Sequence, residues 1–302
     1  RNEIRQVSGE KVVEEATRML ETVGGQAVIE GVMMRSPRYI VTAVRKPNGT
    51  IVHRKDKVRT LTSRFFFKWP FIRGIVMMAE TMVIGIKALN YSANESAEDE
   101  SKEEKLSTLY VIGTLAFSLI FALAIFKLVP LGFAQLLNSR FEMFQNKYLF
   151  NLAEGIVKLL MFVGYICIIS RFKDIKRVFQ YHGAEHKVVN CYEKEKTFNL
   201  ECAKKHSTVH RRCGTSFLLF VIFISFIAYI FLPIDISFLS KFLLRISLLP
   251  VIAAFSYELL KLSSRYETNF LFNILISPGL LLQRLTTSEP DDSQLEVAIH
   301  AL

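Results

Sequence analysis

The chain has 302 residues, of which 51% are hydrophobic, and it contains 25 phenylalanines but a single tryptophan. This composition is far from that of a soluble enzyme and predicts a membrane protein. The formal charge of +10 fits the excess of lysine and arginine that membrane proteins carry on their cytoplasmic side. The N-terminal region lacks the basic segment, apolar core and cleavage site of a signal peptide, so none is expected there.

The N-terminal region predicts a small β element followed by a surface helix. Residues 39–56 alternate apolar and polar side chains on both sides of Asn48-Gly49, the dipeptide best suited to a tight hairpin. The paired glycines of GGQAVIEGVMM, residues 24–34, allow the sharp backbone geometry of a further strand. Residues 71–90 mix apolar and charged side chains, which predicts an amphipathic helix lying on the membrane.

Four later stretches are apolar enough to predict transmembrane helices, which need about 20 residues to cross a bilayer. They are residues 107–126, 148–170, 215–234 and 242–257. A fifth stretch, 270–282, is too short to span, and Pro278 and Gly279 interrupt it. We therefore expect it to be interfacial or re-entrant.

The distribution of basic residues predicts the orientation. Residues 127–147 carry three lysines and arginines, whereas residues 171–212 carry eleven. Basic loops stay on the cytoplasmic side, so both termini are expected in the cytosol. The protein itself is expected in the inner (cytoplasmic) membrane of the cell. The expected fold is a mainly α, multi-pass membrane protein with about four transmembrane helices, a small N-terminal β element and a cytosolic histidine-rich helical loop.

The expected domain organisation follows from these elements. It comprises an N-terminal extension (1–23), the cytosolic β element with its amphipathic helix (24–92), an acidic linker (93–106), the first two transmembrane helices (107–170), the cytosolic His/Cys loop (171–214), the last two transmembrane helices with the interfacial segment (215–282) and a cytosolic tail (283–302).

Glu154 and Lys158 are charged residues inside the second predicted span. They are four apart and can pair on one helix face, so the simplest interpretation is an ion pair near the outer membrane face. A role in transport or in a proton path is the alternative. Charges within a span are often hidden against a neighbouring subunit, which makes a homo-oligomer a further hypothesis.

Histidines are concentrated in one segment: four of the six lie between residues 182 and 210. On a predicted helix over 171–190, His182 and His186 share the apolar face, with Glu185 beside them. A second stripe at helical spacing follows and leads directly into the third span; it contains Cys202, His206, His210 and Cys213. An unpaired imidazole on an apolar face is costly, so each stripe needs a partner.

The spacing H-x-x-E-H from His182 to His186 is the inverted zinc-protease signature, in which two histidines bind the metal and the glutamate activates water. It predicts a divalent metal such as zinc, with Glu185 as catalytic base of a hydrolase. The third ligand is left open among His206, His210 and Glu258, because catalytic zinc usually keeps three protein ligands. A structural zinc site built from the second stripe is disfavoured, because one continuous helix cannot wrap four ligands around an ion.

Other interpretations remain beside this one. The histidines can simply be packed and hydrogen-bonded, and the cysteines, including Cys202 and Cys213, can be buried thiols rather than ligands. Because the loop is predicted to be cytosolic, disulfides are not expected. The alternative function is a non-catalytic scaffold or conduit whose basic cytosolic domain docks membrane lipids or a large partner such as the ribosome or a membrane-insertion machine.

Four motifs together carry a family resemblance. GGQAVIEGVMMRSP, YHGAEHK, HSTVHRRCGTSF and SPGLLLQRLTT resemble, in this order, the YqhQ-like bacterial membrane proteins, a family whose function is unknown. The resemblance covers residue 24 to the C-terminus. It implies a metal-dependent membrane protein, with His182, Glu185, His186, His206 and His210 as the metal-site residues. Members of the family it resembles are often encoded near translation genes, which makes a ribosomal partner a hypothesis.

Overall fold

A computed structural model describes residues 23–58, 69–97, 108–266 and 269–302. The predicted N-terminal extension, apart from Val23, and most of the predicted acidic linker lie outside the described residues. The described chain is mainly helical with a small N-terminal sheet, as the sequence predicted.

The N-terminal segment folds into an antiparallel sheet of four strands in the order β1-β2-β3-β4. Their bounds are β1 Gly24–Val28, β2 Gly31–Arg35, β3 Tyr39–Arg45 and β4 Ile51–Lys57. The predicted hairpin at Asn48-Gly49 is confirmed: Gly49 has φ of 84°, and the Asn48 side chain accepts the backbone N–H of Thr50 at 3.1 Å. The GGQAVIEGVMM segment forms two strands rather than one, because Glu30 turns the chain at φ 52°.

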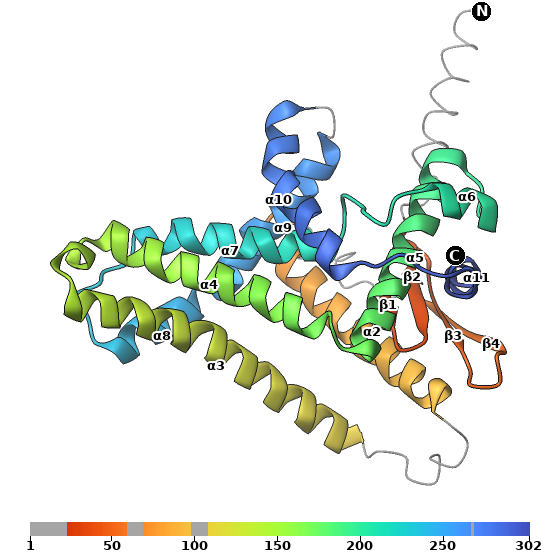
Figure 1. Cartoon of the computed structure of the whole chain (residues 1–302), viewed down its shortest axis with the longest axis horizontal. Coiled ribbons are helices and arrows are strands. Elements are labelled where there is room, and N and C mark those ends of the chain that lie inside the picture. The colour runs from red at the N-terminus through yellow and green to blue at the C-terminus, as the bar shows by residue number, and fades with distance from the viewer. Residues whose placement is uncertain (1–22, 59–68, 98–107, 267–268) are drawn as a thin grey trace, which may run out of the picture.

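Helices cover both faces of this sheet (Figure 1). On one face, Val32 and Met34 pack against α5 (Lys173–Glu195) and α11 (Asp292–Ala301). On the other face, Met33 packs in a cluster with Ala88 of α2 (Ile72–Ser96). Successive side chains of a strand point to opposite faces, so β2 is buried on both sides.

Apolar helices make up the rest of the chain, and in Figure 1 α3, α4, α7 and α8 extend away from the sheet. Their bounds are α3 Thr108–Arg140, α4 Lys147–Ile169, α7 Gly214–Ile230, α8 Phe238–Ser247, α9 Leu249–Arg265 and α10 Phe270–Thr286, with a short 3-10 helix, η4, at Glu142–Gln145. Among the described residues, three helical stretches are long and apolar enough to cross a membrane: Ala116–Arg140, Lys147–Ile169 and Phe238–Ser263.

These helices correct the predicted spans in three places. The first helix does not end at Phe126 but continues to Arg140, so most of the predicted loop 127–147 is helical. The predicted third span is only 17 residues long in α7, shorter than the three long stretches. The α10 helix runs through Pro278, and it equals α7 in length rather than being broken there. Composition locates apolar segments, but capping and packing decide where each helix ends.

The charged residues of the second span lie in the interior of the bundle. Glu154 and Lys158 form the predicted pair, with Lys158 Nζ 3.7 Å from Glu154 Oε1. The closer partner of Glu154 is Arg245 of α8, whose Nη2 lies 2.7 Å from Glu154 Oε2. Arg245 and Glu154 are 0% and 1% exposed. Both predicted charges therefore find partners within a single chain.

The histidine segment departs from its predicted form in its second half. Helix α5 agrees with the predicted helix, but α6 (Leu200–Lys205) ends before His206, and residues 206–213 are not helical. The prediction of a second helical stripe running into the third span is therefore wrong. The backbone of this segment bonds to α5 instead: the Asn190 side chain donates to the carbonyls of Ser207 and Val209 at 2.9 and 3.1 Å.

Candidate metal centre

The centre is built on α5, where His182, Glu185 and His186 share one side of the helix. His182 Nδ1 lies 2.9 Å from the carbonyl oxygen of Thr286, and His186 Nδ1 lies 2.6 Å from that of Thr208. Because a carbonyl can only accept, each Nδ1 carries the proton and each Nε2 keeps its lone pair. A metal-binding histidine usually donates a hydrogen bond in this way from the ring nitrogen that does not bind the metal.

Gly183 lets the Thr286–Ser288 segment come this close to α5. A Cβ at Gly183 would lie 2.1 Å from the carbonyl oxygen of Ser288, and the Ser288 N–H donates to Phe179 O at 2.9 Å. The glycine of YHGAEHK thus has a packing reason, because a larger residue would displace the Thr286–Ser288 segment, which carries the Thr286 carbonyl that orients His182.

Cys213 joins the two histidines from the N-cap of α7. Its Sγ lies 3.3 Å from His182 Nε2, and the ligand atoms of Cys213, His182 and His186 all lie within 4.8 Å of one another. Tetrahedral zinc with N and S ligands needs ligand atoms about 3.5 Å apart, given bonds of about 2.0 to 2.3 Å. Two imidazoles and one thiol at these separations fit such an ion with small side-chain adjustments.

Glu185 lies against this set of ligands and is fully enclosed. Its Oε2 is 3.4 Å from His186 Nε2, and its carboxylate accepts the backbone N–H of Gly25 in β1. A Cβ at Gly25 would lie 2.9 Å from Glu185 Cγ and 2.5 Å from the carbonyl oxygen of Met33, so this close approach requires glycine. Sheet and helix together therefore fix the carboxylate beside the histidines.

Burial dominates the proton equilibria of these groups. It raises the pKa of Glu185 and lowers the pKa of His186 well below its usual value, since both charged forms are desolvated. Burial likewise raises the pKa of Cys213 to about 11. The neutral histidine that these surroundings favour is the form that ligates metal.

The other predicted ligands are placed differently. The His210 ring centroid is 5.7 Å from that of His186, and its Nε2 lies 3.2 Å from Glu193 Oε2. His206 contacts a different carboxylate, with its Nε2 3.0 Å from Glu195 Oε1. Both carboxylate oxygens of Glu258 bond to Arg73 on α2. The structure therefore brings His182, Glu185, His186 and Cys213 together, with His210 adjacent.

The cysteines also differ from the expectation. Cys191 and Cys202 form a disulfide, so the prediction that the cysteines would not pair is wrong for these two. The sequence predicts Cys213 to be a buried thiol or part of a zinc site in the second stripe, and not a partner of His182 and His186. Its position directly before an apolar helix is the one local signal, because a residue there can cap the helix and still project toward a neighbour.

A cavity of about 990 Å³ opens at the centre, between the sheet, α2, α5, α7 and α9. His182, Glu185, His186 and Cys213 form part of its wall. Much of the remaining wall is apolar and includes Met33, Met77, Phe179, Phe217 and Leu260. The candidate ligands therefore face a space large enough for an extended small molecule.

These features define a helical protein with apolar, membrane-length helices and a candidate metal centre where α7 meets the sheet-bearing part of the chain. The chain belongs to the family described as "Protein of unknown function (DUF1385)", whose model matches residues 69–302. It is 39% identical over 292 residues to the "Uncharacterized protein YqhQ" of Bacillus subtilis, covering 92% of this chain and 90% of that protein. The predicted family is thus confirmed. No solved structure matches the chain.

Proposed function

We propose that the protein is a metal-dependent hydrolase that acts at the membrane. One observation carries this proposal: two histidine Nε2 atoms, one cysteine sulfur and one buried carboxylate converge on the wall of a large cavity. Three protein ligands with an adjacent carboxylate are the residue set of many hydrolytic zinc sites.

His182, His186 and Cys213 are the residues that would hold the ion. A divalent ion bound there would supply Lewis-acid polarisation of a substrate carbonyl or phosphoryl oxygen. Glu185 is placed to take a proton from an attacking water and to return it to the leaving group. The backbone N–H of Gly25 keeps the carboxylate in that position.

Membrane placement is a second part of the proposal. Large apolar side chains are exposed on the long helices, among them Phe117, Ile120, Leu160 and Ile168. Exposure of such an apolar surface to water is unfavourable, and a lipid bilayer would cover it. The basic residues of 171–212 favour placing α5, the candidate centre and both termini on the cytosolic side of a bacterial inner membrane.

The cavity indicates the substrate class. Its largely apolar wall suits a hydrocarbon chain, and the candidate centre would meet a polar group at the end of that chain. We therefore infer an amphiphilic substrate whose hydrolysable ester, amide or phosphoryl group reaches Glu185 while its apolar part fills the cavity.

The test combines metal content with turnover by the full chain in mild detergent, purified without reductant or chelator. Elemental analysis should find close to one zinc-class ion per chain. Glu185→Gln should retain the ion but lower hydrolysis of long-chain p-nitrophenyl esters by roughly 10²-fold or more. His186→Ala should lose both ion and turnover, whereas the control His300→Ala changes an exposed histidine of α11 and should change neither.

Two outcomes would refute the proposal. One is a metal content far below one ion per chain in wild type with no further loss in His186→Ala. The other is equal turnover by wild type and metal-loaded Glu185→Gln across esters, amides and phosphodiesters.

A further inference from the structure

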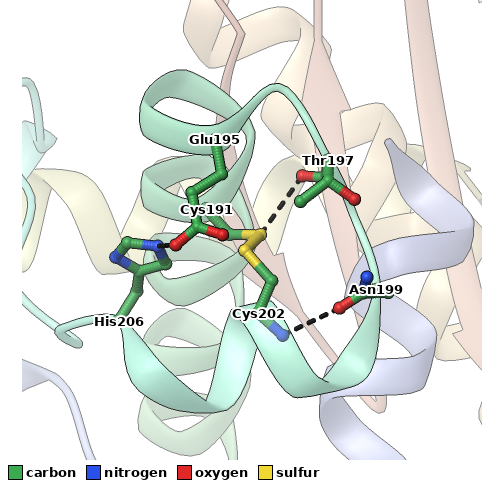
Figure 2. Close-up of a disulfide and its surroundings, with 6 residues drawn as sticks. All are labelled: Cys191, Glu195, Thr197, Asn199, Cys202 and His206. Atoms are coloured by element: carbon green, nitrogen blue, oxygen red, sulfur yellow. Dashed lines mark hydrogen bonds and ion pairs between the residues drawn. A yellow bond between two sulfur atoms is a disulfide. The ribbon is translucent and has the colours of Figure 1, made fainter.

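A second cluster of ligand-type side chains lies where α5 ends and α6 begins. Cys191 and Cys202 are joined by a disulfide with Cα atoms 5.9 Å apart, and ligand atoms of Cys191, Cys202 and His206 all lie within 4.8 Å of one another. The carboxylate of Glu195 lies beside them, with Oε1 3.0 Å from His206 Nε2 (Figure 2).

The four side chains come from two helix ends that face each other. Cys191 and Glu195 are one turn apart at the end of α5, and Cys202 and His206 are one turn apart across α6, with His206 as its C-cap. Asn199 caps the start of α6 by accepting the backbone N–H of Cys202 at 2.8 Å. Two facing pairs can surround an ion, which a single helix cannot do.

Burial divides this cluster into an enclosed half and an accessible half. Both sulfurs are buried, whereas the side chains of His206 and Glu195 are 12% and 49% exposed. Cys191 Sγ lies 3.2 Å from the carbonyl oxygen of Thr197, a distance at which a thiol, but not a disulfide sulfur, can donate a hydrogen bond (Figure 2). The surroundings thus provide an acceptor for a reduced thiol and a path for an ion from solvent.

We propose that Cys191, Glu195, Cys202 and His206 form a second metal site, occupied by a zinc-class ion when the cysteines are reduced. Two thiolates, one imidazole and one carboxylate are ligands that zinc prefers. The disulfide is then the metal-free, oxidised form of the same site. This proposal does not depend on the proposed hydrolase.

The two forms interconvert by thiol–disulfide exchange. The thiolate of a low-molecular-weight thiol attacks one sulfur, forms a mixed disulfide and releases the other cysteine as a thiolate. A second thiol molecule completes the exchange, so that two cysteine thiols and one small-molecule disulfide result. Binding of zinc then displaces the two thiol protons.

Either form of the site would hold α6 against α5, and this matters for the candidate centre described above. The chain continues from His206 to Thr208, whose carbonyl bonds to His186 Nδ1, and then to Cys213. A bound ion would therefore replace the disulfide as the anchor of this segment.

Co²⁺ binding to the full chain in mild detergent tests the proposal. The Cys213→Ser background removes the thiolate of the first centre, so thiolate-to-cobalt charge-transfer absorption reports the second site. The protein is first reduced with dithiothreitol, which is then removed under anaerobic conditions because this dithiol itself binds Co²⁺. The band should then saturate near one Co²⁺ per chain. Oxidised glutathione should abolish it, and renewed reduction should restore it. Adding Cys202→Ser should remove the band, whereas Cys167→Ser on α4 is the matched control and should leave it unchanged.

Two surface changes cover the case in which Cys202→Ser fails to fold. His206→Ala and Glu195→Gln alter partly exposed side chains, and each should weaken Co²⁺ binding by at least about tenfold. The proposal is overturned if the reduced Cys213→Ser protein, with unchanged circular dichroism, shows no band. It is equally overturned if Co²⁺ affinity is the same in His206→Ala and Glu195→Gln as in their parent.

Discussion

Replacing Glu154 by glutamine removes the carboxylate that contacts Arg245 and Lys158 inside the helical bundle. Glu154 is 1% exposed, and its oxygens accept bonds from the guanidinium of the fully buried Arg245 at 2.7 to 3.0 Å. Lys158 contributes a second cation, with its Nζ 3.7 Å from Oε1. In Glu154→Gln both cations stay buried but lose this anion.

The size of the effect follows from the fact that two buried cations, Arg245 and Lys158, share the carboxylate of Glu154. Removing one partner of a buried ion pair lowers the free energy of unfolding by about 3 to 5 kcal/mol, because the remaining charge is desolvated without compensation. Arg245→Gln should lower it less, by about 1 to 3 kcal/mol, because Glu154 keeps Lys158 as a counter-ion. The double variant should be more stable than the sum of the two losses predicts.

Thermal unfolding in detergent measures the difference. With roughly 2 to 4 °C per kcal/mol for a chain of this order of size, the midpoint of Glu154→Gln should fall by roughly 6 to 20 °C. The matched control is Glu142→Gln, which replaces an exposed glutamate and should leave the midpoint unchanged. The reasoning is refuted if Glu154→Gln unfolds at the wild-type temperature, or if Arg245→Gln is the more damaging of the two.

Three further perturbations probe the candidate centre and its supports. Gly183→Ala should lower stability by about 1 to 3 kcal/mol and weaken metal binding, because its Cβ would meet the carbonyl of Ser288 at 2.1 Å. Gly164→Ala on α4, where a Cβ meets nothing within 4 Å, should be neutral or stabilising, and equal losses in both variants would contradict this. Asp291→Ala removes the capping box of α11 and should cost about 1 kcal/mol in chemical denaturation, whereas Asp291→Asn should retain most of that stability; similar losses from both would argue against the cap. Chelation with EDTA should lower the free energy of unfolding of the oxidised wild type by about 2.7 kcal/mol if free metal was at a hundred times its Kd, and the thermal midpoint should fall accordingly. An equal shift in His186→Ala would exclude the first centre as the cause.

Local signals in the sequence were sufficient for several elements. Asn48-Gly49 predicted its hairpin, because the backbone angles of that turn favour these two residues. The apolar spacing around His182 and His186 predicted α5 and placed both histidines on one face. Apolar stretches predicted where membrane-length helices occur, though not their ends.

Features that join distant residues could not be predicted in this way. Cys213 reaches His182 across 31 positions because residues 206–213 leave the helix and bond to α5, which no period in the sequence indicates. Arg245 contacts Glu154 across 91 positions in the sequence, so helical spacing predicted only the pairing of Glu154 with Lys158, four residues away. The Cys191–Cys202 pair depends on how α6 folds back onto α5.

The sequence by itself therefore determined which candidate residues share one face of α5, because a helix places residues three and four apart on one face whatever surrounds it. Only the tertiary structure decided what they face. The third candidate ligand, the carbonyls that orient both imidazoles and the glycine that holds Glu185 come from α7, the 206–213 and 286–288 segments and β1. Their convergence is a property of packing between elements distant in the chain, and spacing along the sequence does not encode it.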